Sequence, residues 1–77
     1  MGRLNEKDKD NRIDYILDLM ITYEDKEDMI ISFNDKFNLG IDSFYKYFKL
    51  TKNKLKEQVD NDELTEEEIL KYIKYLI

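Results

Sequence analysis

The sequence predicts an all-α protein, folded as a small bundle of about five short helices. Apolar residues recur at intervals of three and four, which is typical of helices, and the strict alternation typical of strands is absent. None of the 77 residues is proline, and the two glycines stand at positions 2 and 40. We expect residues 1–10, which are polar and charged, to form a flexible N-terminus, and residues 11–77 to form a single helical domain.

The first helix should begin at Asp10 or Asn11, because either side chain can cap the free amides of a first turn. Its apolar stripe consists of Ile13, Ile16, Leu17, Met20 and Ile21. If this helix continued, the stripe would next contain carboxylates, beginning at Glu24, and burying them unpaired is costly. We therefore expect a break near residues 22–26. The stripe needs a cover, either from the body of the same chain or from a second copy in a homodimer.

A second helix is predicted between this break and Gly40. Its apolar positions are Met29, Ile30, Phe33 and Phe37. The helix should end before Gly40, because glycine adopts a left-handed conformation at little cost.

Two short helices, joined by a turn at residues 49–51, are expected to follow. The first, over about residues 42–48, presents Phe44, Tyr45 and Phe48 on its apolar side. Thr51 should cap the second, which turns Leu55 and Val59 inward. The run Asp-Asn-Asp at residues 60–62 is typical of a turn.

The last helix should begin after Thr65. Thr65 and Glu68 have the spacing of a capping box, in which each side chain accepts a hydrogen bond from the other residue's backbone amide. The residues expected to be buried are Ile69, Leu70, Ile73, Leu76 and Ile77. Tyr72 and Tyr75 stand beside lysines, and they could either extend a surface for a partner or pack on the core.

Residues 39–59, LGIDSFYKYFKLTKNKLKEQV, resemble the helix-turn-helix of Cro/repressor-like (XRE-type) DNA-binding proteins. The matching positions are Leu39 before the first helix, Phe44 and Phe48 within it, Leu50 and Thr51 at the turn, and Leu55 and Val59 in the second helix. The resemblance implies a helix-turn-helix-like centre in which two short helices cross over a short turn and the second enters a major groove. The chain departs from the family at Tyr45, usually a small residue, and at Lys49, usually glycine.

A basic segment coincides with this motif. Residues 44–59 carry five lysines and one acid, whereas residues 1–43 are net −5 and residues 60–77 are net −4. Phosphate contacts supply most of the non-specific affinity for nucleic acids, so the segment indicates a nucleic-acid surface. The candidate binding residues are Lys46, Lys49, Thr51, Lys52, Asn53, Lys54 and Lys56. Asn53 would contact a base edge and the lysines would contact phosphates. The alternative is that these charges only solvate an exposed helix face.

Catalysis and metal binding find no support in the composition. Histidine and cysteine are both absent, which excludes the commonest general base and any thiolate metal site. No glycine-rich phosphate loop is present, and we expect neither an enzyme nor a cofactor. The acidic run at residues 66–68 is explained by the dipole of a helix N-terminus. No apolar run is long enough to cross a membrane, no signal peptide begins the chain, and we expect a cytoplasmic protein.

These observations predict a small helix-turn-helix DNA-binding regulator whose partner is double-stranded DNA. The abundance of Lys, Asp, Asn, Ile and Tyr is typical of AT-rich genomes, which indicates a phage, plasmid or other mobile element of a low-GC bacterium. The alternative is an acidic protein–protein interaction module or inhibitor that has the helical fold but does not bind DNA. The net charge of −5 favours this alternative, because an acidic body would engage a basic partner or mimic the charge of a nucleic acid. The fold alone does not determine which function is right.

Overall fold

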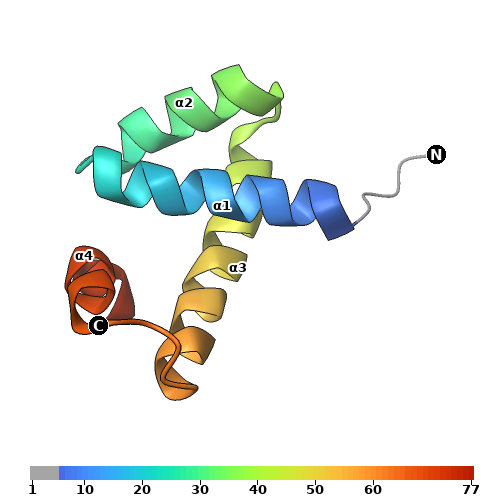
Figure 1. Cartoon of the computed structure of the whole chain (residues 1–77). Helices are drawn as coiled ribbons and strands as arrows, with labels where there is room; N and C mark the ends of the chain where they lie inside the picture. The colour runs from blue at the N-terminus through green and yellow to red at the C-terminus, as the bar shows by residue number, and fades with distance from the viewer. Residues whose placement is uncertain (1–5) are drawn as a thin grey trace.

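Helices account for most of residues 6–77, the part of the chain that this computed structural model describes. Within that range there are four: α1 (Glu6–Thr22), α2 (Lys26–Phe37), α3 (Ile41–Asp60) and α4 (Glu66–Leu76). Figure 1 shows α1 and α2 lying side by side, with α3 crossing α1 and α4 set apart beside the second half of α3. The all-α prediction is confirmed, but the prediction of about five helices is wrong. None of the described helices is long and apolar enough to span a bilayer.

Helix α1 begins at Glu6, before the predicted caps at Asp10 and Asn11, and residues 1–5 of the expected flexible N-terminus lie outside the described residues. Three members of its predicted stripe are buried, Leu17 packs against the core, and Ile21 is half exposed. Leu19, which was not predicted, is also buried. The cover comes from the same chain, because α1 packs on α2, α3 and α4.

The predicted break at residues 22–26 is confirmed, since α1 ends at Thr22 and α2 begins at Lys26. Helix α2 ends at Phe37, before Gly40 as predicted, but Gly40 is not the residue that takes the left-handed conformation. Asn38, with φ 55°, takes the left-handed conformation, and its amide donates a 2.7 Å hydrogen bond to the carbonyl of Asn34. Gly40, with φ −76°, instead precedes the first residue of α3. Asparagine is among the residues that adopt the left-handed region most readily, so it replaces glycine here.

Helix α3 is continuous over 20 residues, so the predicted turn at residues 49–51 and the two short helices around it are wrong. Its buried residues keep one helical register across the predicted turn: Phe44, Tyr47, Phe48, Thr51 and Leu55. Thr51 is fully buried, and its hydroxyl donates a 2.7 Å hydrogen bond to the carbonyl of Tyr47 four residues earlier. A threonine satisfied in this way sits inside a helix instead of capping one.

The core lies where α1 and α2 meet α3. Phe33 of α2 and Phe44 of α3 are both fully buried, with ring centroids 5.6 Å apart in an edge-to-face arrangement. Phe44 in turn stacks on Phe48 at 5.4 Å. Arg12 of α1 donates a 2.9 Å hydrogen bond from Nη1 to the hydroxyl of buried Tyr47, which ties α1 to α3. These contacts fix α3 as the element on which the other three helices are arranged.

Helix α4 is well capped but loosely packed. The predicted capping box is confirmed, because the Thr65 hydroxyl accepts from the Glu68 amide and the Glu68 carboxylate accepts from the Thr65 amide. No side chain of Glu66–Leu76 is fully buried. Ile69 and Leu76 are half-buried, whereas Leu70 is 67% exposed and Ile73 is 43% exposed, so their predicted burial is wrong. Ile77, also expected to be inward, is 96% exposed.

Candidate functional site

The seven predicted nucleic-acid-binding residues lie on α3, but they do not share one face. Lys49, Lys52 and Lys56 are three and four residues apart, which places them along one side of the helix. Lys46 and Asn53 are exposed on the same side, because Lys46 lies three residues before Lys49 and Asn53 lies three residues before Lys56.

The remaining two predicted residues, Thr51 and Lys54, make contacts within the chain. Thr51 is in the core. Lys54 faces α1, where its ammonium lies 3.7 Å from the carboxylate of Asp14. The structure therefore places five of the seven residues along one side of α3 and separates Thr51 and Lys54 from them.

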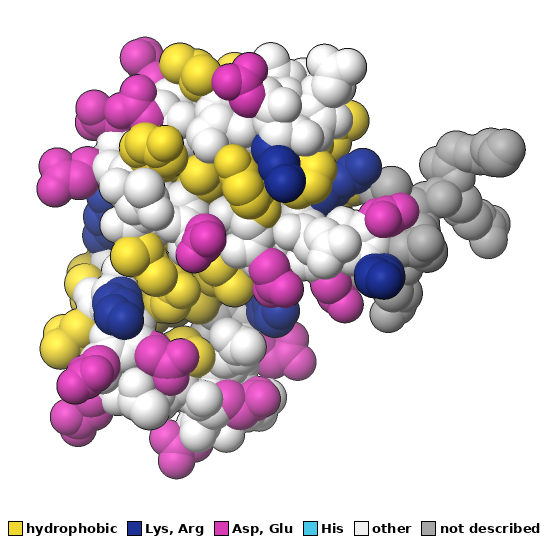
Figure 2. Space-filling model, turned by 45° about the horizontal axis from the view of Figure 1, so that its top comes forward, with side chains coloured by type: hydrophobic (Ala, Val, Ile, Leu, Met, Phe, Trp, Pro, Cys, Tyr) yellow, Lys and Arg dark blue, Asp and Glu magenta, His cyan; other side chains and the backbone are white. Residues whose placement is uncertain are grey.

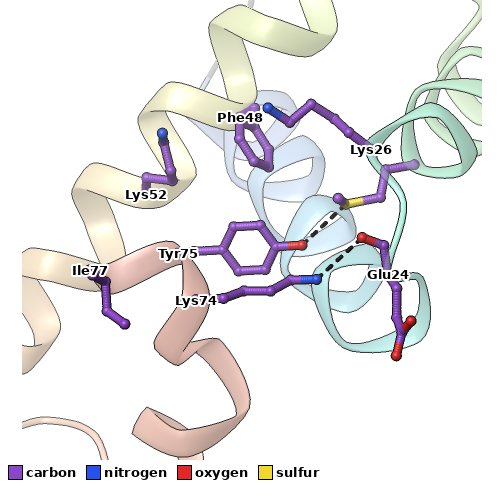
Figure 3. Close-up of a pocket in the computed structure, with 8 residues that line it drawn as sticks. Glu24, Lys26, Phe48, Lys52, Lys74, Tyr75 and Ile77 are labelled. Atoms are coloured by element: carbon purple, nitrogen blue, oxygen red, sulfur yellow. Dashed lines mark hydrogen bonds between the residues drawn. The ribbon is translucent and has the colours of Figure 1, made fainter.

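A hollow lies where α2, α3 and α4 approach one another, and Lys52 is the α3 lysine that lines it (Figure 3). Its volume is about 290 Å³. The residues that line it are Glu24, Lys26, Met29, Phe48, Lys52, Lys74, Tyr75 and Ile77. We call this site the hollow. The lining comes from three helices and the α1–α2 connection.

The floor of the hollow is apolar. Met29 and Phe48 are buried, with exposed fractions of 1% and 4%, and Tyr75 is half-buried. The Phe48 and Tyr75 rings meet edge to face, with centroids 5.7 Å apart. The Tyr75 hydroxyl donates to Met29 Sδ at 3.9 Å, so the floor is held by contacts among all three helices.

Three lysines surround this floor. The ammonium nitrogens of Lys26 and Lys52 lie over the Phe48 ring, 5.1 Å and 5.3 Å from its centroid. Lys74 lies 5.2 Å from the Tyr75 ring centroid and donates a 3.2 Å hydrogen bond to the carbonyl of Glu24. These cation–π contacts hold the ammonium groups at the apolar surface without neutralising them.

The hollow is a positive site in a negative protein. Within residues 6–77, none of its three lysines forms an ion pair with a carboxylate. Glu24 is the acidic residue of the lining, and Figure 3 shows its carboxylate pointing away from the lysines. A concave surface lined by one sign of charge concentrates the field and attracts the opposite charge. The arrangement is therefore suited to an anionic group attached to an apolar one.

An apolar stripe on α4 continues from the hollow. It consists of Leu70 and Ile73 of α4 and of Ile77, the residue that follows the end of the helix, and all three are exposed. We call it the α4 stripe. Ile77 belongs to both the stripe and the lining of the hollow, so the two surfaces are continuous. Figure 2 shows hydrophobic side chains at the surface in the region of α4, next to a basic side chain. Acidic side chains lie around this part of the surface.

Sequence reasoning identified Lys52 but missed the other two lysines of the hollow. Lys26 and Lys74 come from α2 and α4 and stand far from Lys52 in the chain, so no local pattern connects them. Tyr75 was open to two interpretations, and its ring now forms part of the floor. The one signal in the sequence was the pairing of Lys74 with Tyr75 near the end of an amphipathic helix.

Acid–base and metal chemistry have no evident centre in the described residues. No group of three or more His, Cys, Asp or Glu side chains within residues 6–77 is placed to hold a metal ion. Burial, with the charges of Asp18 and Glu68, raises the pKa of Tyr72, so this phenol stays neutral near pH 7. The lining of the hollow can bind a ligand by charge and by apolar contact.

Comparison with known proteins adds no relative to this picture. No family model, curated protein or solved structure matches the chain. The geometry of the hollow and the α4 stripe is consequently the basis for assigning a function.

Proposed function

We propose that this chain is a protein-interaction module that binds its partner through the α4 stripe and the adjoining hollow. The observation that carries the proposal is the state of α4, a capped helix with no fully buried side chain that exposes Leu70 and Ile73 and is followed by exposed Ile77. An exposed apolar row beside a charged hollow is typical of a surface that another protein covers.

The architecture of α3 also favours this proposal over groove reading by a helix-turn-helix. A recognition helix has to begin at a turn, so that its N-terminal residues reach base edges. Residues 49–51 lie in the middle of α3, and Thr51 is buried.

DNA binding by a small regulator is the second candidate, and the row of Lys49, Lys52 and Lys56 favours it. With Lys26 and Lys74, these lysines provide five cations that phosphates could contact. Binding of this kind would depend on phosphate contacts along the side of α3, and it would discriminate little between base sequences.

A salt titration with a random-sequence DNA duplex separates the two candidates. The interaction module is expected to show no detectable binding at low salt. A regulator would instead bind, with a slope of several units in log K against log salt concentration. Binding with such a slope would contradict the proposal.

A capture experiment tests the surface itself. The wild-type chain, a Leu70→Ser/Ile73→Ser variant and an Ile31→Ser control would be immobilised and exposed to extract of a low-GC bacterium. Ile31 is 62% exposed on α2 and lies outside the lining of the hollow, so its variant removes a similar apolar surface elsewhere. We expect one stoichiometric partner to be retained by the wild type and the control, and lost by the α4 variant. Equal retention by all three would exclude the α4 stripe as the docking surface.

A further inference from the structure

We infer that the hollow receives an acidic peptide segment of a partner protein, with an apolar side chain on the floor and neighbouring carboxylates on Lys26, Lys52 and Lys74. The inference rests on the proposed function and specifies the chemistry of the partner. It follows from the hydrogen-bonding state of the lysines, the apolar floor and the positions of the aromatic rings.

The lysines retain unused donors. Each ammonium group has three N–H donors. Lys74 uses one on the carbonyl of Glu24, and within the described part of the chain Lys26 and Lys52 donate to no protein acceptor. Carboxylates are the acceptors that form the strongest hydrogen bonds with such donors. An acidic segment would therefore find three cations that are already positioned around one site.

The floor adds a requirement for an apolar group. Met29, Phe48 and Tyr75 present carbon and sulfur surface, and Ile77, 96% exposed, would be covered by any ligand that fills the hollow. The volume of about 290 Å³ is at the lower end of the range for small-molecule pockets, which is roughly 300–1,000 Å³. It suits one side chain of a peptide better than a whole drug-sized molecule.

The ring geometry favours a peptide over a nucleic acid. Single-stranded nucleic acids bind aromatic sites by stacking bases on ring faces. Lys26 and Lys52 both lie over the face of Phe48, and Lys74 lies over Tyr75. The two rings also meet at 84°, so they form no common stacking platform. A base would have to displace ammonium groups, whereas carboxylates would bind them where they are.

The α4 stripe extends the site beyond the hollow and favours a helical segment as the partner. Leu70 and Ile73 are exposed on α4, and Ile77, which follows the helix, lines the hollow. An amphipathic acidic helix could place its apolar side along this row and its carboxylates toward the lysines. Charge complementarity therefore selects an acidic amphipathic segment as the occupant.

Three synthetic probes test the inference: a capped amphipathic helical peptide of glutamate and leucine, the same peptide with glutamine in place of glutamate, and single-stranded oligothymidylate. Binding would be followed by fluorescence anisotropy and by amide shifts in NMR spectra. We expect the glutamate peptide to bind and to shift the signals of Met29, Phe48 and Tyr75, and the glutamine peptide to bind more weakly. Lys26→Met and Lys52→Met should each weaken binding about two- to fivefold, as for exposed ion pairs, because methionine keeps the apolar stem and removes the charge.

Lys46→Met is the matched control, because Lys46 lies on α3 but outside the lining of the hollow. It should leave the affinity unchanged. Equal binding of the glutamate and glutamine peptides, or equal effects of Lys46→Met and Lys52→Met, would overturn the inference. Oligothymidylate that binds more tightly than the glutamate peptide, with shifts at the hollow, would assign the site to nucleic acid. If no peptide binds but the captured partner is still lost with Leu70→Ser/Ile73→Ser, the interaction module stands and the assignment of the hollow falls.

Discussion

At the scale of single residues, Thr51 and Thr65 show one residue type in two different roles. Both are threonines near acidic or basic runs, and both were predicted to cap a helix. Thr65 does so, because its hydroxyl accepts from the amide of Glu68. Thr51 is buried, and its hydroxyl donates to the carbonyl of Tyr47. A threonine hydroxyl can satisfy itself in either way, so the residue type alone could not distinguish the cap from the helix interior.

The same substitution at these two positions should therefore have different effects. Thr65→Val removes an accepted amide hydrogen bond at a helix start, and we expect it to lower the free energy of unfolding by about 0.5–2 kcal/mol. Thr51→Val replaces the hydroxyl by a buried methyl group and removes one hydrogen bond to the Tyr47 carbonyl, which remains within a helix. The two effects oppose each other, so the free energy of unfolding should change by less than about 1 kcal/mol. Urea unfolding measures both variants. If Thr51→Val lowered the free energy of unfolding more than Thr65→Val, the result would contradict the interior position of Thr51 and favour the predicted turn at residues 49–51.

The capping box also predicts a pH dependence. Hydrogen bonds from the backbone amide and then the hydroxyl of Thr65 hold the pKa of Glu68 below its ordinary value of 4.5. Because the folded-state pKa is the lower one, the stabilisation is complete above the unfolded-state pKa and is lost as pH falls through the folded-state pKa. Wild type should melt above Glu68→Gln at pH 7, and the gap should close as acid is added.

Glu67→Gln is the control for this titration. It removes one carboxylate from the same first turn of α4 without touching the capping box. The difference in melting temperature between wild type and Glu67→Gln should change less as the pH falls over the same range. Melting curves that move equally for Glu67→Gln and Glu68→Gln would show that the dipole of the helix, and not the box, determines the pH dependence.

At the scale of elements, α3 shows that the residue spacing of a helix-turn-helix also fits one continuous helix. The motif requires apolar residues at spacings of four on both sides of its turn, and Phe44, Phe48 and Leu55 satisfy it. The same positions also satisfy an uninterrupted helix, whose buried side runs on through Thr51. Only a glycine or proline at the turn would have separated the two possibilities, and the sequence has lysine at position 49.

Substitutions of Lys49 test the continuity of α3. In the middle of an exposed helix surface, Lys49→Gly should be less stable than Lys49→Ala by about 1 kcal/mol. In a turn that needs a positive φ angle the order would be reversed, because glycine adopts it without strain. The difference between the two variants in chemical denaturation gives the sign. Glycine as the more stable residue would contradict a continuous α3.

At the scale of the whole molecule, the sequence predicted the helical class and several helix boundaries well. It predicted less well which helix surfaces are buried. The all-α class, the break at residues 22–26 and the start of α4 follow from local rules of spacing and capping. Leu70 and Ile73 were expected to be inward because they lie on the apolar side of α4. That side is wider than the area that α1 and α3 cover, and its uncovered part is the α4 stripe. The hollow could not be predicted, because it depends on how three helices meet.

Substitutions of Leu55 and Leu70 measure the difference between a side chain that the core covers and one that α4 leaves exposed. Leu55 is 1% exposed, and Leu55→Ala should cost about 2–5 kcal/mol by opening a cavity in the core. That is a large part of the roughly 4–12 kcal/mol expected for a chain of this length. Leu70→Ala, at a position that is 67% exposed, should change stability by less than about 0.5 kcal/mol. A similar loss in both variants would mean that α4 is packed more fully than described.

The sparse burial of α4 has a consequence for the dynamics of the chain. A helix without a fully buried side chain can unfold locally at a lower free energy than the core, so its amide protons should exchange with solvent faster than those of buried α3 residues. Native-state hydrogen exchange would measure this directly, and equal protection of α3 and α4 would contradict it. Since Lys74 and Tyr75 belong to α4, one wall of the hollow would open and reform with that helix. A bound partner would then stabilise α4 against local unfolding, and the slowing of its exchange would report occupancy of the site.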